Sequence, residues 1–452
     1  MSADTVPGAH RGAPGGTVAR ALVNARLVDP AQRLNGPGGV IIEDGRIVAA
    51  GAEVTADVAR SHGVPEETIL DCAGKWLLPG LVDMRVFTGE PGFEYRETLA
   101  TASAAAAAGG VTTMIVMPDT DPVIDDAAIV DFILRRARGT SKVRVHPMAA
   151  ITRGLRGEHM SEVGLLREAG AVALTDGRRG VASARVLARA LAYARDFDML
   201  VAQHVEDAEL AGPGVMHEGE LAARLGLPGI PRQAEIIALE RDIRLVEMTG
   251  ARYHAAQISC AESVEIVRRA KEAGLPVSCG VSINHLMLNE HDIGAYRTFF
   301  KLSPPLRTEE DRAALVEGMS AGVIDVIVSS HDPQSADTKR LPFAEAGFGA
   351  VGLETMLSAA LSLHHSGQVG LARLVGAMGQ APATLLGLEG GTLKPGAPAD
   401  LVLVDPHLSW KVEAEALHSR SRNTPFEDRV FEGRAVMTLV AGTVAFDYDA
   451  QT

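Results

Sequence analysis

The stretch GLVDMRVF at residues 80–87 is the first of eight short apolar runs in the middle of the chain. Each run is followed by a polar residue and then by a segment rich in Ala, Leu, Glu and Arg, which is typical of a helix. The runs lie at residues 80–87, 112–118, 143–149, 171–176, 199–204, 252–258, 277–282 and 323–331. Because parallel strands are joined by long crossovers, this alternation predicts an α/β fold, a (β/α)8 TIM-type barrel. An open doubly wound sheet is the competing fold, but the Gly-rich phosphate-binding motif that it often carries is missing from the sequence.

The segments on either side of this middle region have a different pattern. Residues 17–75 and 388–447 contain short apolar runs separated by turns, and VIIEDGRIVAA at residues 40–50 is two such runs around Asp-Gly, a strong hairpin signal. We predict that both segments build one small β-sandwich domain beside a barrel of residues 76–387. The Gly-, Pro- and Ala-rich residues 1–16 are expected to be a mobile tail.

Composition excludes several classes of partner. The chain has 452 residues, with 57 acidic against 43 basic side chains and a formal net charge of −14. Nucleic acids and anionic membranes bind proteins through basic surfaces, so we expect neither as a partner. Three scattered cysteines are too few for a disulfide framework, and no apolar stretch reaches the roughly 18 residues of a membrane span. We therefore expect a cytoplasmic protein.

Longer phrases in the sequence resemble a known family. They include LLPGLVDM at residues 77–84, EPGFEYRET at 90–98, AAAAGGVTTMIVMPDTDPV at 105–123, GTLKPGAPADLVLVDP at 391–406 and SRNTPFEDRVFEGR at 421–434. These phrases resemble dihydroorotases, and most closely the class associated with aspartate carbamoyltransferase. The resemblance spans roughly residues 17 to 447 in order. It implies an amidohydrolase barrel flanked by a small β-sandwich, with zinc at the mouth of the barrel in active members.

The resemblance also implies six metal-ligand positions, most of which are replaced in this chain. The expected ligand is lost at four of them, namely Arg85, Phe87, Gln257 and Ser330. A phenyl ring has no lone pair to offer, and a guanidinium is always cationic and cannot be a ligand. Asp176 and His204 keep the family's residue. Two donors fall short of the three protein ligands of a catalytic zinc, so we expect no metal site, no catalytic residue and no cofactor.

The positions that hold the substrate in the family are altered too. By the resemblance they fall on Gly89, Asp119, Ser303 and Gln334. Gly89 stands where the family has an arginine that pairs with the substrate carboxylate, and Asp119 would repel that carboxylate. An improvised single-metal site is the alternative, and its candidate ligands are His285, His331 and Asp332.

Three hypotheses for the function follow from these losses. The leading one is a dihydroorotase-like pseudoenzyme, which is not an enzyme and acts as a structural or regulatory partner in pyrimidine biosynthesis. By analogy, that partner is aspartate carbamoyltransferase, in a homo- or hetero-oligomer. The alternative is a metal-dependent cyclic amidohydrolase of dihydroorotase or hydantoinase type, with an altered mononuclear zinc site. The third is a small-molecule sensor in which Arg85 anchors an anion.

Overall fold

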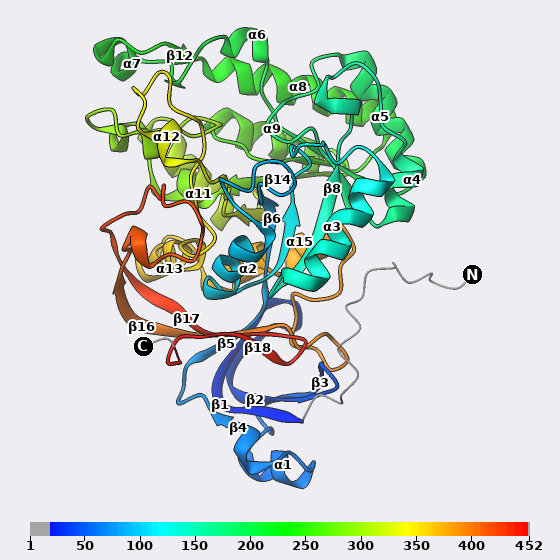
Figure 1. Cartoon of the computed structure of the whole chain (residues 1–452), viewed down its shortest axis with the longest axis vertical. Coiled ribbons are helices and arrows are strands. Elements are labelled where there is room, and N and C mark those ends of the chain that lie inside the picture. Colours follow the sequence, from blue (N-terminus) through cyan, green and yellow to red (C-terminus); the bar gives the residue numbers. More distant parts are fainter. Residues whose placement is uncertain (1–18, 451–452) are drawn as a thin grey trace.

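A parallel barrel and a second sheet make up the computed structural model, which describes residues 19–450 (Figure 1). The mobile tail predicted at residues 1–16 lies outside the described residues. The strands of the barrel are β6 (Leu81–Val86), β7 (Val111–Val116), β8 (Arg144–Ala149), β9 (Ala173–Leu174), β10 (Leu200–Gln203), β13 (Tyr253–Ala255), β14 (Val277–Ser282) and β15 (Val326–Val328). Each strand pairs in parallel with the next, in the order β15-β14-β13-β10-β9-β8-β7-β6. Val86 forms a parallel bridge with His331, which brings the chain after β15 back to β6. The predicted barrel is confirmed.

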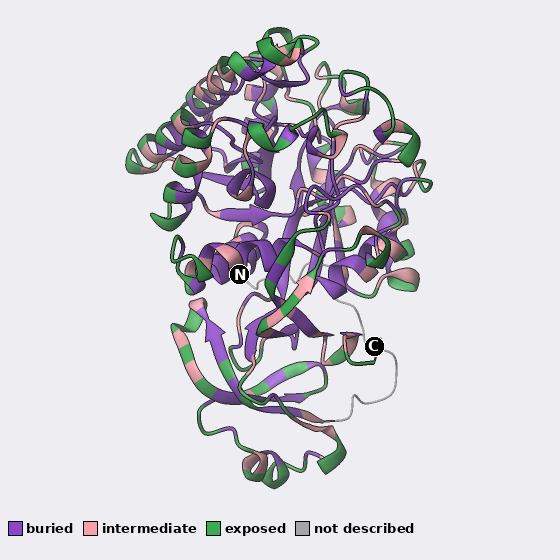
Figure 2. Ribbon diagram, turned by 90° about the vertical axis from the view of Figure 1, so that its left-hand side faces the viewer, coloured by how far each residue is buried: buried purple, intermediate pink, exposed green. Residues whose placement is uncertain are grey.

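Apolar side chains fill the inside of the barrel. One buried cluster contains Val82, Met84, Ile115, Met148, Ala173, Leu200, Ala202, Val326 and Val328. These residues come from six different barrel strands, so the interior is a packed core and not a channel. Figure 2 shows the barrel strands as the most buried part of the molecule. Chemistry is therefore confined to the ends of the strands.

Helices follow most of the strands and cover the outside of the barrel. They are α2 (Leu99–Ala108), α3 (Ala127–Thr140), α4 (Val163–Ala169), α5 (Ala184–Asp196), α8 (Arg232–Thr249), α9 (Ala261–Glu272), α11 (Glu309–Ser320), α13 (Met356–His365), α14 (Leu371–Met378) and α15 (Gln380–Leu386). Four of them begin at a side chain that accepts hydrogen bonds from the first turn, namely Thr98, Asp126, Ser183 and Thr308. No helix in residues 19–450 is long and apolar enough to span a membrane.

Shorter elements lie in the connections. They are η1 (Pro30–Gln32), α1 (Ala56–Ser61), η2 (Glu66–Thr68), η3 (Arg153–Leu155), α6 (Ala208–Ala211), β11 (Met216–His217), α7 (Glu220–Leu225), β12 (Gly229–Ile230), α10 (Ile283–Met287), η4 (Glu290–Ile293), η5 (Thr298–Phe300), α12 (Ala336–Lys339) and η6 (Ala414–Ala416).

The second sheet is built from both ends of the described chain. Its strands are β1 (Arg20–Asp29), β2 (Leu34–Glu43), β3 (Arg46–Gly51), β4 (Ile69–Asp71), β5 (Trp76–Pro79), β16 (Leu401–Lys411), β17 (Val430–Val440) and β18 (Thr443–Asp447). The order is β18-β17-β16-β5-β1-β2-β3, with β4 beside β1. The predicted hairpin joins β2 to β3. Because β5 belongs to this sheet, the sheet extends beyond residue 75, where we placed its boundary; the division into domains itself stays a prediction.

Helix α2 packs between the barrel and the second sheet. It contacts β7 on one side and β17 and β18 on the other. Its alanine run is buried, since a methyl side chain allows both layers to approach closely. Gly109, directly after the helix, also packs closely on its neighbours, because a Cβ there would lie 2.1 Å from the carbonyl oxygen of Leu353. The alanine run is therefore a packing feature.

Candidate active site

Arg85 and Phe87 end the first strand of the barrel, and both are buried. The Arg85 guanidinium makes one long contact of 3.5 Å with the carbonyl oxygen of Gly177. The ring of Phe87 packs against two guanidinium groups, with the Arg96 carbon 4.2 Å and the Arg178 carbon 5.5 Å from its centre. These replacements thus put one cation and a cation-binding ring where the family has two imidazoles.

A network of ion pairs lies beside this ring. Arg178 donates to Asp119 at 2.8 Å and to Asp332 at 3.2 Å. Arg96 donates to the other oxygen of Asp332 at 2.7 Å, and the Gln334 amide donates to that same oxygen at 3.0 Å. Both oxygens of Asp332 are thus held by arginines and are not free for a metal.

Asp176 follows β9 and is almost completely buried. Its carboxylate accepts hydrogen bonds from the backbone N–H of Thr152, at 2.9 Å, and from the Thr152 hydroxyl. Burial raises the pKa of Asp176 to about 6, although the hydrogen bonds from Thr152 oppose the shift. Asp176 can therefore exchange a proton near neutral pH.

His204 follows β10, and neither nitrogen of its ring has a hydrogen-bond partner among the described residues. The nearest carboxylate is that of Glu206, whose oxygen lies 3.8 Å from Nε2. Burial raises the pKa of Glu206, but the contact with His204 outweighs it and the pKa is lowered overall. The imidazole is therefore buried beside an anion, with both ring nitrogens available for a hydrogen bond to a ligand.

Other polar groups at neighbouring strand ends also lack partners. The side-chain amides of Gln203, Gln257 and Asn284, with Nδ1 of His285, are buried without a hydrogen bond in the described chain. They follow or end β10, β13 and β14, which are adjacent and parallel, so they lie toward the same end of the barrel. A buried polar group without a partner costs about 1–3 kcal/mol. Such a set is typical of a place where a polar ligand or water binds.

The candidate ligands of an improvised metal site are engaged elsewhere. His331 is buried and contacts Glu97, with Nε2 3.3 Å from the carboxylate. Nε2 of His285 lies 3.0 Å from the carbonyl oxygen of Pro304, and burial lowers the pKa of this ring to about 4. With Asp332 held by arginines, these three side chains do not form one metal site.

The remaining replaced positions serve local structure. Gly89 has a φ of +67°, and a Cβ there would lie 2.5 Å from the carbonyl oxygen of Glu97, so this turn excludes an arginine. Ser303 and Ser330 are partly exposed, and Ser330 also has a positive φ of 53°. The backbone N–H of Gln334 donates to the side chain of Asn423 at 3.1 Å. None of these residues supplies the cation that would pair with a substrate carboxylate.

The comparisons with known proteins agree with the barrel and identify the family. A family model described as "Dihydro-orotase-like" matches residues 74–263. A dihydroorotase of Anaeromyxobacter sp. (strain K) is 44% identical over 428 residues, which cover 94% of this chain and 97% of that protein. The chain belongs to the dihydroorotase family. A dihydroorotase of Syntrophotalea carbinolica is 41% identical over 94% of this chain and 98% of that protein. Among solved structures, an L-hydantoinase (dihydropyrimidinase) from Arthrobacter aurescens superposes with a TM-score of 0.84 at 25% identity, covering 95% of this chain and 96% of that one.

Membership of the dihydroorotase family contradicts the predicted pseudoenzyme. Relatives that are similar over nearly their whole length carry the name of an enzyme, and a hydantoinase shares the fold. The expectation that the chain is not an enzyme is wrong for the same reason. Replacement of ligands at four of the six inherited positions does not decide what the other residues at the mouth of the barrel can do. The findings favour the alternative, a cyclic amidohydrolase.

The prediction that no cofactor is needed is contradicted too, because dihydroorotases and hydantoinases are generally metal-dependent. The donor set of this chain nevertheless does not fit zinc. A catalytic zinc takes three protein ligands, and within residues 19–450 no group of three or more His, Cys, Asp or Glu side chains is placed to hold a metal. No residue of the described chain is therefore assigned as a metal ligand.

Several residues of this site escaped the sequence argument. They are Arg96, Arg178, Thr152, Glu97, Gln203 and Asn284. Arg96 lies within the family phrase EPGFEYRET, which was a usable signal. Arg178 lies two residues after Asp176, but nothing in the sequence pairs it with Asp119 or Asp332, because those contacts span 59 and 154 residues.

Proposed function

We propose that this chain is a cyclic amidohydrolase that opens the ring of a cyclic amide by hydrolysis, with a site altered from the dihydroorotase or hydantoinase type. The single observation that carries the proposal is the set of buried, unpartnered polar groups at the ends of β10, β13 and β14. A cyclic amide presents N–H donors and C=O acceptors close together. The amides of Gln257 and Asn284 offer both kinds of partner, so they complement such a ring.

His204 is the residue proposed to move the proton. Its ring has two free nitrogens, and Glu206 at 3.8 Å stabilises the cation that forms when the ring accepts a proton. Asp176 holds its proton up to a pH of about 6 and lies at the end of the neighbouring strand. The two retained family residues thus provide an acid–base pair at adjacent strand ends.

A direct assay of ring opening tests this function. Dihydroorotate, dihydrouracil and hydantoin would each be supplied with and without added Zn²⁺, and the open-chain product measured. We expect turnover of at least one substrate, and His204→Ala should lower kcat/KM by roughly 100-fold or more, the usual contribution of a general acid or base. His407→Ala is the matched control, because that ring is exposed on the second sheet. Absence of turnover in every condition, or an unimpaired His204→Ala variant, would contradict the proposal.

We further propose, from the resemblance alone, that the chain assembles with aspartate carbamoyltransferase and is an oligomer. The support is the likeness of its phrases to the class of dihydroorotases associated with that enzyme. Size-exclusion chromatography of the two proteins, separately and mixed, tests it. Co-elution at a larger size is expected, and unchanged elution of both proteins would contradict it.

A further inference from the structure

Three guanidinium groups lie at the mouth of the barrel, and two of them pair with the carboxylates there. Arg96 and Arg178 are each within 3.2 Å of Asp119 or Asp332. Arg85, which is 93% buried, has no carboxylate oxygen within 4.0 Å in the described part of the chain. Its long contact with Gly177 is its one side-chain hydrogen bond in residues 19–450. A buried cation with so few partners is costly and calls for an anion.

The carboxylates around Arg85 act on it only at a distance. Burial lowers the pKa of its guanidinium; Asp119, Asp332 and, more weakly, Asp83 oppose this. The Asp83 carboxylate accepts from the backbone N–H groups of Arg85 and Ser329, so it is engaged at the strand itself. None of these carboxylates pairs directly with Arg85, so an anion from outside the chain has a cation available to it.

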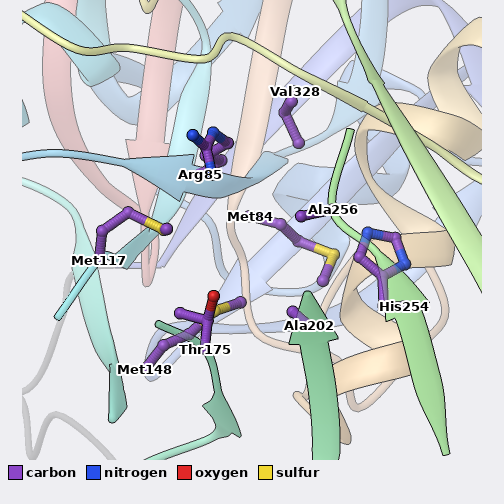
Figure 3. A pocket seen from close by; sticks show the side chains of 9 residues that line it. All are labelled: Met84, Arg85, Met117, Met148, Thr175, Ala202, His254, Ala256 and Val328. Atoms are coloured by element: carbon purple, nitrogen blue, oxygen red, sulfur yellow. The ribbon is translucent and has the colours of Figure 1, made fainter. Parts of the chain in front are cut away.

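The inner side of Arg85 is closed to a ligand. Figure 3 shows Arg85 at an interior pocket together with methionines, Thr175 and His254. The pocket has a volume of about 10 Å³, which is room for one water molecule at most. Burial lowers the pKa of His254 to about 4, so this ring is neutral at pH 7. An organic anion can therefore reach Arg85 only from the outer side, where Arg178 lies.

Arg178 reaches across the mouth on that outer side. It follows β9, whereas Asp119 follows β7 and Asp332 follows β15. Around the barrel, β15 is separated from β9 by β6, β7 and β8, so it stands on the opposite wall. Gly177, which precedes Arg178, packs on Asp119, since a Cβ there would lie 3.1 Å from its carboxyl carbon. The Arg178 side chain is one-third exposed and thus accessible to a ligand.

We propose that Arg178 and Arg85 form a carboxylate-binding subsite for the ring substrate, and that the ligand's carboxylate takes the place of Asp119 on Arg178. The class of ligand rests on the proposed function; the subsite rests on the charges at the mouth. In the absence of ligand, Arg178 pairs with both Asp119 and Asp332. Binding exchanges an internal carboxylate for the ligand's, and Arg85 gains the anion that it lacks.

The test compares two rings that differ in the carboxylate alone. Binding of dihydroorotate and dihydrouracil to the full chain would be measured by calorimetry, independently of turnover. We expect wild-type protein to bind dihydroorotate at least tenfold more tightly. Arg178→Met and Arg85→Met should each remove that preference while leaving the affinity for dihydrouracil within about twofold. Asp119→Asn should tighten dihydroorotate binding severalfold, because Arg178 is released. Arg179→Met, at the exposed neighbouring arginine, is the matched control and should change neither affinity.

The outcomes separate this proposal from the proposed hydrolase. Equal affinity for the two rings in wild-type protein, no binding of dihydroorotate, or a preference that survives in Arg178→Met overturns the subsite. Tight, carboxylate-dependent binding without ring opening supports the subsite and contradicts the hydrolase. Ring opening without any preference for the carboxylate supports the hydrolase and contradicts the subsite. Since Asp119→Asn removes no cation, it keeps the test decisive if either arginine variant fails to fold.

Discussion

The guanidinium of Arg178 donates a 2.8 Å hydrogen bond to the carboxylate of Asp119, which lies 59 residues earlier in the chain. From the sequence, Asp119 repels any substrate that carries a carboxylate. In the structure its charge is paired with Arg178, a cation that can bind another carboxylate in its place. Asp119 therefore occupies the cation that a substrate carboxylate would bind, and a carboxylate ligand has to displace it from Arg178.

The contact between Phe87 and Arg96 gives a prediction on stability. The Arg96 guanidinium lies 4.2 Å from the centre of the buried ring. Phe87→Leu removes this cation–π contact and should lower the free energy of unfolding by about 1–2 kcal/mol. Phe132→Leu is the control, because that ring is 41% exposed on α3. Urea denaturation of both variants measures the difference, and equal losses would refute the role of the stacked guanidinium.

Asp176 predicts a dependence of stability on pH. Its pKa is about 6 in the folded protein and about 3.9 in an unfolded chain. The folded state therefore binds this proton more tightly, so the contribution of Asp176 is most favourable below pH ~4 and is lost as the pH rises to about 6. The loss from this group is about 3 kcal/mol at most.

The Asp176→Asn variant checks that dependence. Free energies of unfolding at pH 4, 5, 6 and 7 should fall less steeply in Asp176→Asn than in wild-type protein. Burial also raises the pKa of Asp83 and Asp242 to about 6, so part of the slope remains in both. Asp196→Asn, at an exposed carboxylate, should keep the full wild-type slope. Parallel curves for wild type and Asp176→Asn would show that this carboxyl does not titrate as described.

Gly89 gives a prediction on backbone strain. Its φ is +67°, and a Cβ would lie 2.5 Å from a carbonyl oxygen. Gly89→Ala should therefore cost at least about 1–3 kcal/mol of stability. Gly74 has a similar φ of +79° with nothing within 4 Å of a Cβ, so Gly74→Ala isolates the cost of the dihedral angle alone. Thermal denaturation should rank Gly89→Ala clearly below Gly74→Ala; the opposite order would refute the steric argument.

Gln257 gives a prediction in which stability and activity move in opposite directions. Its buried amide has no partner in the described chain. Gln257→Leu should raise the free energy of unfolding by about 1–2 kcal/mol, because an unpaired polar group is removed. The same change should lower kcat/KM for the ring substrate, because a ligand contact is lost. Gln368→Leu, at an exposed glutamine, should alter neither quantity. A Gln257→Leu variant that is less stable yet fully active would contradict this assignment.

The sequence predicted the barrel well because the strands of a parallel sheet are buried on both faces and therefore form apolar runs. The sequence also placed the replaced residues at the strand ends, because a stretch that resembles the family fixes the position of each residue along its own strand. It could not predict their partners. Asp176 bonds to Thr152 and Phe87 packs against Arg178, because these contacts join different strand ends.

The pseudoenzyme predicted from the sequence was wrong for a related reason. Arg85 and Phe87 stand where the family has metal ligands, and from the sequence this loss of donors predicts loss of activity. The structure adds what the sequence could not show, namely that His204 keeps both nitrogens free and that Arg178 neutralises Asp119. Similarity over 94% of the chain, rather than the number of retained ligands, identified an enzyme family.

The pairing of β5 with β16 affects how the protein folds during its synthesis. β5 leads through Gly80 directly into β6, and its neighbour β16 lies more than 300 residues later, with Leu401 opposite Pro79. On the ribosome, the first barrel strand would thus extend from a sheet that lacks its C-terminal strands until nearly all of the chain has emerged. Such distant pairing slows folding and leaves a strand edge unprotected in the meantime. Shortened chains that stop before β16 should consequently aggregate during synthesis, even though every barrel strand is present.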